Sequence, residues 1–294
     1  MELLAQRCAR LGLSPQWLLE RDAPGGLRPP GLVSANGHCH LLRCGDGWAA
    51  INLAREDDRD VLPGLVEGGS SLADVAAGMP AIEFRNRAAQ LQLPVAVLGE
   101  AAPAALAEPG PIRVPRRVLD LSALWAGPLC AALLARSGAE VLRIESIGRP
   151  DPTPLSSPLL DTKLNGAKER LPLDLRSEAG RARLHAEIAR ADVIVTSGRA
   201  AALARLGLEP ARFPDRTWVA ITGHGFSSTR VGFGDDCAVA GGLVDRQGGE
   251  PRFRGDALAD PLTGLEAALS VLSGCRGLID MAMAGVAASY AAAS

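Results

Sequence analysis

The second part of the chain alternates short apolar strands with helices, and this alternation is the strongest constraint on the fold. Runs rich in valine, isoleucine and leucine predict strands at residues 117–121, 140–145, 171–175, 192–196 and 218–222. Helices are predicted at residues 129–137, 177–191, 200–206 and 263–272. Because strands that are joined by helices pair in parallel, the pattern predicts an α/β fold: a parallel sheet with helices on both faces.

Two turn-rich stretches divide the chain into two modules. Residues 22–31 and 100–111 are rich in proline, glycine and alanine, which is typical of connecting segments. We therefore predict a smaller α+β module at residues 1–110, which opens on a short helix. The parallel-sheet module is predicted at residues 111–294.

The smaller module contains a hairpin pattern. Strands are predicted at residues 40–44 and 48–53, joined by a turn at Gly45–Gly47. The other elements predicted there are a helix at 57–66, a helix at 71–92 interrupted by Gly78 and Pro80, and a strand at 94–98. In the second module, a loop rich in proline and serine is predicted from residue 146 to about Lys163.

Composition excludes several classes of protein. The net charge of -2 argues against a protein that coats nucleic acid or an acidic membrane. The longest uncharged runs, residues 121–135 and 281–294, are shorter than the roughly 20 apolar residues of a membrane-spanning helix. The first residues lack a secretory pattern. Six cysteines are too few for a disulfide scaffold, so we expect a cytoplasmic protein.

One group of potential metal ligands stands out in the sequence. His38, Cys39 and His40 are consecutive, and Cys44 follows four residues later. A zinc site usually needs a second pair of ligands, and none lies nearby in the sequence. We interpret the two cysteines as buried thiols and expect no bound metal.

The start of the second module favours an anionic ligand. Ligands of parallel sheets lie beyond the carboxyl ends of the strands, often at helix N-termini, where free N–H groups favour anions. Ala126-Gly127-Pro128 follows the first strand and opens a helix, so a phosphate or carboxylate can bind there. The dinucleotide pattern G-x-G-x-x-G does not follow Leu121, which argues against a nicotinamide or flavin enzyme.

Five stretches carry a family resemblance. They lie in one order along the second module, at residues 118–145, 164–181, 191–208, 221–243 and 259–265. Together they resemble the family III CoA-transferases, a group that also contains acyl-CoA racemases. The resemblance covers residues 116–284, and it implies that residues 111–294 form a CoA-binding, Rossmann-like module with the catalytic aspartate.

The first module resembles a different part of the same family. Residues 31–48 are similar to the glycine-loop strand and small domain, which normally follow the region matched by Asp260. Family members are also longer than this chain. Two origins are open: the pieces are permuted here, or a duplicated ancestor has been trimmed.

Asp260 is the candidate nucleophile. The resemblance implies that the matched aspartate attacks the acyl-CoA carbonyl to give a mixed anhydride, and then becomes a thioester with CoA. Covalent catalysis of this kind divides one difficult exchange into easier steps. The structural alternative is that Asp260 caps a helix whose first residue is Pro261, where aspartate is preferred. The two interpretations are compatible.

The resemblance also implies a set of CoA-contacting residues. Basic side chains suit the phosphates of CoA, and small residues let a ligand approach the backbone. The residues implied are Ala126, Gly127, Arg143, Asn165, Lys168 and Arg199. Only two of the 31 bases are lysines, Lys163 and Lys168, and Lys168 takes the matched position. Gly166 stands where many members have arginine. Arg199 also has a structural interpretation, because an exposed arginine after a strand is commonplace.

Four residues are candidates for contact with the acyl group: Trp125, Phe233, Asn36 and Gly37. Trp125 suits an apolar wall, or equally a core position. Phe233 stands where the racemases carry a histidine, and Asp235 and Asp236 are offset from the racemase aspartate. We interpret His224 as a packing residue. The shielding glycine loop is reduced to Ser34–Gly37.

These observations predict an enzyme that transfers CoA between carboxylic acids through an aspartyl-CoA thioester. Two alternatives are open: an acyl-CoA racemase, isomerase or dehydratase in which Asp260 is a base, and a non-catalytic member that binds CoA esters or supports a partner. No permanently bound cofactor is expected, with CoA and acyl-CoA as substrates. A homodimer, or a heteromer with a related subunit, is implied by the resemblance, and neither nucleic acid nor membrane is expected as a partner.

Overall fold

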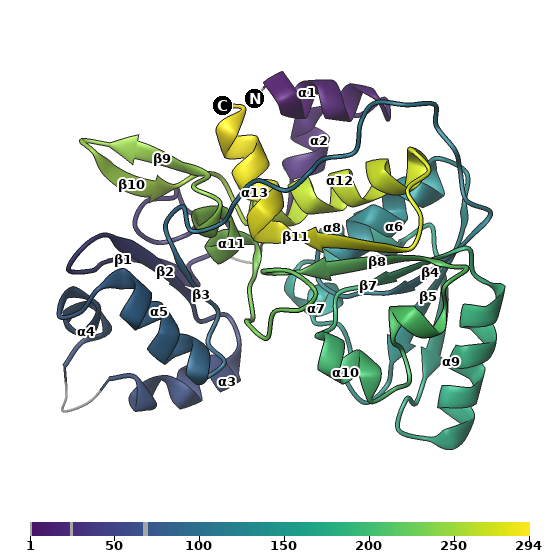
Figure 1. Ribbon diagram of the computed structural model, residues 1–294, viewed down its shortest axis with the longest axis horizontal. Coiled ribbons are helices and arrows are strands. Elements are labelled where there is room, and N and C mark those ends of the chain that lie inside the picture. Colours follow the sequence, from purple (N-terminus) through teal and green to yellow (C-terminus); the bar gives the residue numbers. More distant parts are fainter. Residues whose placement is uncertain (1, 24–25, 67–69) are drawn as a thin grey trace.

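The large sheet is the main feature of the structure, a computed structural model that describes residues 2–23, 26–66 and 70–294. Its order is β11-β8-β7-β4-β5-β6, and every neighbouring pair is parallel (Figure 1). The strands are β4 (Arg117–Leu121), β5 (Glu140–Ser146), β6 (Glu169–Leu173), β7 (Val193–Thr196), β8 (Thr217–Thr222) and β11 (Leu278–Ala282). The predicted α/β fold is thereby confirmed.

Helices cover both faces of this sheet (Figure 1). One face carries α6 (Ala126–Arg136), α8 (Pro158–Asn165), α12 (Ala259–Leu272) and α13 (Met283–Ala292). The other face carries α9 (Glu178–Arg190) and α10 (Ala200–Ala204), and a 3-10 turn follows at Pro210–Arg212. Because alanine and glycine line their contact, α6 and α12 pack closely: a Cβ on Gly264 would lie 2.6 Å from the Ala126 carbonyl oxygen.

The strand order reverses beside β4. The chain runs outward from β4 through β5 to β6, then returns to place β7 on the other side of β4. The loops that follow β4 and β7 meet at this switch point, where the Ala123 N–H donates to Ser197 Oγ at 2.9 Å. Ligands of open α/β sheets lie at such points, so the loop that leads into α6 is well placed for a site.

The smaller module is built on a three-stranded antiparallel sheet, β1-β2-β3. Its elements are β1 (Cys39–Arg43), β2 (Trp48–Asn52), α3 (Glu56–Val61), a 3-10 turn (Leu62–Gly64), α4 (Leu72–Ala77), α5 (Ala81–Gln90) and β3 (Val95–Val97). The predicted turn at Gly45–Gly47 joins β1 to β2. Gly78 caps the end of α4 and Pro80 precedes α5, so the helix predicted at 71–92 is divided where those residues indicated.

The two modules share secondary structure. A hairpin of β9 (Val244–Gln247) and β10 (Glu250–Phe253) lies beside β1 (Figure 1), and α11 (Gly234–Ala240) packs on β2 and β3. Cys39, Leu41 and Ala50 from the small sheet form one buried cluster with Val239 and Phe253. Residues after 230 therefore complete the core of the first module.

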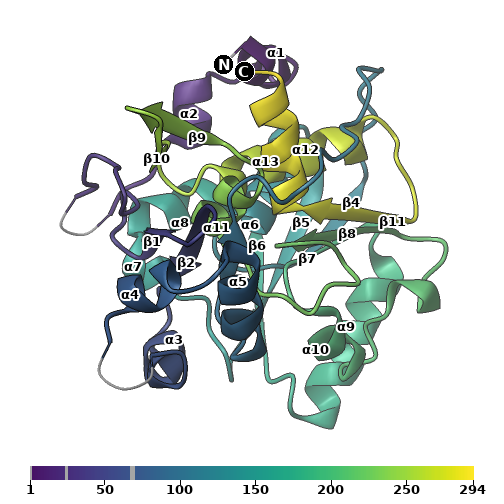
Figure 2. The same ribbon diagram turned by 60° about the vertical axis from the view of Figure 1, so that its left-hand side comes forward.

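The first helices belong to the second module. α1 (Glu2–Ala9) and α2 (Pro15–Leu19) lie near α12 and α13 (Figures 1 and 2), with Leu4 and Leu18 in the large core. The Arg7 guanidinium forms a buried ion pair with Glu266 of α12. The Tyr290 hydroxyl donates to the same carboxylate at 2.6 Å.

The segment after β5 differs from the prediction. The structure has two helices, α7 (Thr153–Ser156) and α8, where a loop was predicted from residue 146 to Lys163. Asp151 accepts from the Thr153 N–H, and Asp22 accepts from the Leu160 N–H at 2.8 Å. A cap supplied from 138 residues away leaves no local signal. Across the described residues, no helix is both long enough and apolar enough to cross a membrane.

Candidate active site

Asp260 lies where three helices begin. It is in the first turn of α12, and the backbone amide of Ala126, which opens α6, lowers its pKa. A Cβ on Gly234, the first residue of α11, would overlap Asp260 Oδ2, so only glycine fits there. The capping interpretation is wrong, because α12 begins at Ala259 and its cap residue is Leu258. Asp260 keeps a partly exposed side chain beyond the strand ends.

A group of acidic side chains surrounds this aspartate. Asp235 and Asp256 are buried, and their charges raise the pKa of Asp260. Asn36 joins them from the smaller module: its amide donates to Asp235 at 2.7 Å and to Asp256 at 3.2 Å. Arg21 donates to both oxygens of Asp256 at 2.6 Å. We call Asp235, Asp256 and Asp260 the carboxylate cluster.

Burial raises the pKa of three neighbouring carboxyl groups. It raises the pKa of Asp260 to about 7, against the opposing charge of Arg21. It raises the pKa of Asp235 to about 6, although the Asn36 amide favours the ionised form. It raises the pKa of Asp236 to about 8, against a hydrogen bond from the Phe233 N–H. Desolvation is the largest cause in each case, because an apolar surrounding disfavours the charged form.

These raised pKa values predict that the fold weakens as the pH rises from 6.5 to 8. Unfolded aspartates titrate near pH 4, so the folded chain binds these protons more tightly. Their contribution is complete below pH 4 and is lost as the pH rises through the folded pKa values of about 6, 7 and 8. The lowered pKa of His224, about 4, has a smaller effect of the opposite sign, which is nearly complete at about pH 7.5 because unfolded histidines titrate near pH 6.5. We expect the free energy of unfolding to fall by about 2 kcal/mol over this interval.

Urea unfolding in a chelating buffer at pH 6.5 and at pH 8 measures this loss. Asp236→Asn keeps the shape of the side chain and removes its titration, so the variant should show a smaller loss between the two pH values. Equal stability of the parent protein at both pH values would contradict the raised pKa values.

Trp125 borders the cluster. Its side chain is only 3% exposed, and its indole N–H has no hydrogen-bond partner among the described residues. The Arg21 guanidinium carbon lies 5.4 Å from the ring centroid. A buried donor without a partner is costly, so this N–H would gain from an acceptor atom of a ligand.

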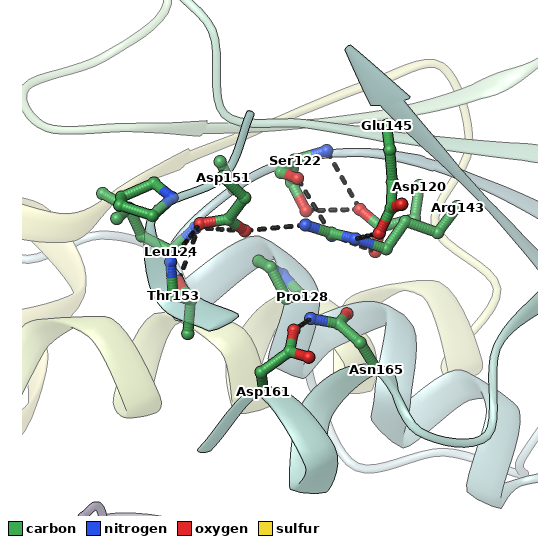
Figure 3. A network of polar contacts seen from close by, with 12 residues as sticks. Asp120, Ser122, Leu124, Pro128, Arg143, Glu145, Asp151, Thr153, Asp161 and Asn165 are labelled. Carbon is green, nitrogen blue, oxygen red and sulfur yellow. Dashed lines mark hydrogen bonds and ion pairs between the residues drawn. The ribbon is translucent and has the colours of Figure 1, made fainter. Parts of the chain in front are cut away.

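A second polar network surrounds the start of α6 (Figure 3). The Lys168 ammonium donates to Asp120 at 2.7 Å, to the Pro128 carbonyl at 2.8 Å and to Asn165 Oδ1 at 2.9 Å. An ammonium has three donors, and the Lys168 side chain has no exposed surface. Burial would raise the pKa of Asp120, but Lys168 and Arg143 outweigh it and lower that pKa.

Arg143 and Asn165 are part of the same network. Arg143 pairs with Asp151 at 2.7 Å and with Asp120 at 3.3 Å, and Figure 3 shows it between these carboxylates. The Asn165 amide donates to Asp161 at 2.7 Å. The polar groups of Arg143, Asn165 and Lys168 thus face other side chains in this structure, and their contact with CoA stays a prediction.

Gly127 has a structural explanation. A Cβ at this position would overlap the Ser122 side chain, because α6 begins close to the end of β4. The space on the Cβ side of Gly127 is therefore filled by Ser122, and contact between the Gly127 backbone and a ligand stays a prediction. Ala126 remains beside the carboxylate cluster through its backbone amide.

The other predicted residues are divided between the cluster and the surface. Phe233 precedes α11, with the Arg55 guanidinium carbon 5.6 Å from its ring centroid. Gly37 follows Asn36 in the loop that reaches the cluster and has a φ of +83°. Arg199 is exposed and donates to Gln92 of the smaller module at 2.7 Å. The structure brings Asn36 to Asp235 and Asp256 of the carboxylate cluster and leaves Arg199 elsewhere.

Sequence reasoning did not assign Arg21, Asp235 or Asp256 to the site. The pair Asp235-Asp236 at the start of an apolar helix was a usable signal, since acidic residues are rarely buried unless they are paired. The ion pair between Arg21 and Asp256 spans 235 positions and leaves no local pattern.

The fold and the carboxylate cluster define an α/β protein with a partly buried acidic centre beyond the strand ends. Residues 116–287, more than half of the chain, match the model of CoA-transferase family III. The chain therefore belongs to this family, as its motifs indicated. The match lies wholly within the second module.

Two curated relatives are named as CoA-transferases. Over 178 residues, the chain is 31% identical to a formyl-CoA:oxalate CoA-transferase of Bradyrhizobium sp., covering 53% of this chain and 41% of the relative. Over 124 residues, it is 32% identical to a cinnamoyl-CoA:phenyllactate CoA-transferase of Clostridium sporogenes, covering 37% and 30%. The chain spans about two-fifths of the length of the formyl-CoA relative.

A solved structure supports the fold. The chain resembles a CAIB/BAIF family protein from Brucella suis with a TM-score of 0.54 and 26% identity. The similarity covers 60% of this chain and 55% of the other.

Proposed function

We propose that the protein transfers CoA between carboxylic acids, with Asp260 as the nucleophile. The observation that carries the proposal is the position of Asp260: a partly exposed residue with a desolvated carboxyl group at three helix starts, in a chain of this family. Its pKa of about 7 leaves an ionised fraction near neutral pH. A desolvated carboxylate is also a stronger nucleophile than a hydrated one.

The reaction balances as four acyl transfers. The Asp260 carboxylate attacks the thioester carbonyl, and CoA leaves as a thiolate, which gives a mixed anhydride. The thiolate attacks the aspartyl carbonyl, so the first carboxylic acid leaves and an aspartyl-CoA thioester forms. The acceptor carboxylate displaces CoA from that thioester, and the thiolate then attacks the acceptor acyl carbon to release Asp260.

The residues around Asp260 can stabilise the negative charge that develops on the carbonyl oxygen during the reaction. Each addition places a negative charge on a carbonyl oxygen, and helix N-termini favour negative charge. The unpartnered Trp125 N–H offers a hydrogen bond to such an oxygen. Asn36, held by Asp235 and Asp256, fixes the loop of the smaller module against the cluster.

Trapping the intermediate tests the proposal. The protein is incubated with a panel of acyl-CoA esters, quenched with hydroxylamine and digested, and the peptide that contains Asp260 is weighed. An aspartyl hydroxamate at Asp260 is the expected product. An unmodified Asp260 with every ester, together with full CoA exchange in Asp260→Asn, would overturn the nucleophilic role.

Replacing Trp125 by phenylalanine tests the indole donor. Trp125→Phe removes one N–H and keeps an aromatic ring, so we expect kcat to fall roughly 10- to 100-fold with little change in KM. Stability should fall by about 1–3 kcal/mol, because the smaller ring leaves a cavity in the core, so kcat is measured under conditions where the variant is folded. Trp48→Phe in the smaller module is the matched control. An unchanged kcat in Trp125→Phe would assign Trp125 to packing alone.

A second candidate function is proton exchange at the carbon beside the thioester. The raised pKa values of Asp235 and Asp260 favour it, since two acids that titrate near neutral pH suit a proton donor and acceptor. Deuterium that enters the acyl group from solvent, without migration of CoA, would support this function over transfer.

The remaining expectations stay predictions. These are CoA and acyl-CoA as substrates without a resident cofactor, a homodimer or a heteromer with a related subunit, and a cytoplasmic location. Sedimentation tests the homodimer, and co-purification tests the heteromer with a related subunit.

A further inference from the structure

Three potential metal ligands meet beside α11, outside the carboxylate cluster. His224 lies in the loop after β8, and Asp236 and Cys237 lie in the first turn of α11. One ligand atom from each lies within 4.8 Å of the other two. Asp236 and Cys237 are fully buried, whereas His224 is partly exposed at the loop. His38 and Cys39, by contrast, form no such group in the part of the chain that is described.

Two further observations indicate that the three side chains share one space. His224 Nε2 is buried and has no hydrogen-bond partner in the described part of the chain. A Cβ on Gly232 would lie 2.6 Å from Cys237 Sγ and 3.2 Å from His224 Nε2. Both atoms therefore lie beside the Cα of Gly232, and a larger residue at position 232 would displace them.

We propose that His224, Asp236 and Cys237 form a zinc site with three protein ligands and one open position. Nitrogen, thiolate sulfur and carboxylate oxygen are the ligand types that zinc takes, and three protein ligands with one open position are typical of catalytic zinc. The charges balance, since Zn²⁺ with an ionised Asp236, an ionised Cys237 and a neutral imidazole has no net charge. A neutral centre suits a buried location.

The protonation states agree with this geometry. Burial, helped by the charge of Arg230 and opposed by that of Glu100, lowers the pKa of His224 to about 4, so its ring is neutral at pH 7. Burial also raises the pKa values of Asp236 and Cys237. Zinc must therefore displace two protons, and binding should strengthen as the pH rises.

The centre adjoins the candidate active site. The charge of Asp260 is near enough to raise the pKa of the Cys237 thiol, and that of Asp235 raises the pKa of Asp236. Asn52 of β2 donates to Asp236 at 3.4 Å, which holds the carboxylate from the other side. The zinc proposal does not rest on CoA transfer, because it concerns binding alone.

A metal-free interpretation uses the same atoms. The Cys237 thiol donates to the Gly223 carbonyl at 3.5 Å, and a protonated Asp236 needs no cation. Under that interpretation the group is a hydrogen-bonded part of the core, and His224 Nε2 stays without a partner. Metal binding distinguishes the two interpretations directly.

The test measures metal stoichiometry and the ligand set. Protein purified without a metal column is stripped with chelator, loaded with Zn²⁺ or Co²⁺ at pH 8, desalted and assayed by elemental analysis. We expect one zinc per chain, and a thiolate-to-cobalt charge-transfer band in the near ultraviolet. Cys237→Ser should abolish that band, and His224→Gln should lower zinc retention at least tenfold.

Cys130→Ser is the matched control, since Cys130 is equally buried but lies in α6, outside the group. It should retain zinc and the cobalt band. If Cys237→Ser fails to fold, the spectrum of the parent protein still decides the question. A parent protein that retains less than a tenth of a metal per chain, or a cobalt complex without a thiolate band, would overturn the site.

Discussion

Asp260→Asn is expected to lower the rate of CoA exchange by about 10³- to 10⁴-fold, the loss seen when a member of a covalent catalytic group is removed. The amide has nearly the same shape as the carboxylate, but it cannot form the anhydride. Burial disfavours the charge at Asp260, which is why its pKa is raised. The variant should therefore be at least as stable as the parent protein, so the rate loss separates from any effect on folding.

Initial rates with an acyl-CoA and a free carboxylic acid, followed by chromatography of the CoA esters, measure this effect. Asp245→Asn is the control, because Asp245 is an exposed acid on β9. A rate in Asp260→Asn within a factor of three of the parent would remove Asp260 from the reaction.

Lys168→Ala is expected to lower the free energy of unfolding by about 3–5 kcal/mol, the usual cost of removing one partner of a buried ion pair. In the variant, Asp120 keeps only the ion pair with Arg143, at 3.3 Å. The Pro128 carbonyl and Asn165 Oδ1 lose the hydrogen bond that the Lys168 ammonium donates to each of them. Urea unfolding, with CoA affinity measured on the folded fraction, separates stability from binding.

Lys163→Ala is the matched comparison. Lys163 is half-buried and contacts the Trp17 ring and two backbone carbonyls, so its loss should cost about 1 kcal/mol. If the Lys168→Ala variant is stable and binds CoA more weakly, Lys168 contacts CoA, as the family resemblance implied, and is not mainly structural.

The fold was largely predictable because its signals are local. Strand composition and helix spacing depend on neighbouring residues, so β4, β5, β7, β8 and α9 lie at or near their predicted positions. Ser177, for example, caps α9 by accepting from the Gly180 N–H, as its position before the helix indicated. Strand β11 and helix α8 were missed, since neighbours far along the chain stabilise them. The hairpin β9-β10 was missed although its strands pair with each other across Gly248-Gly249, which is a local turn signal.

Of the candidate site, the sequence indicated only the residues that belong to a family motif. The family pattern led to Asp260, but a motif does not show which side-chain donors already have hydrogen-bond partners within the protein. The ammonium of Lys168 is saturated by Asp120, Pro128 and Asn165. Spacing alone could not show that, nor that Arg21 would reach the cluster.

The pair between Arg7 and Glu266 also constrains how the chain can fold during synthesis. Arg7 leaves the ribosome 259 residues before its partner, which is roughly 10–50 s at typical elongation rates. Throughout that time α1 has no α12 to bind, and its apolar side chains stay exposed. The core of the second module therefore closes only after α12 has been made, and contacts of such long range slow folding. Helix α1 reaches its native place long after its own synthesis.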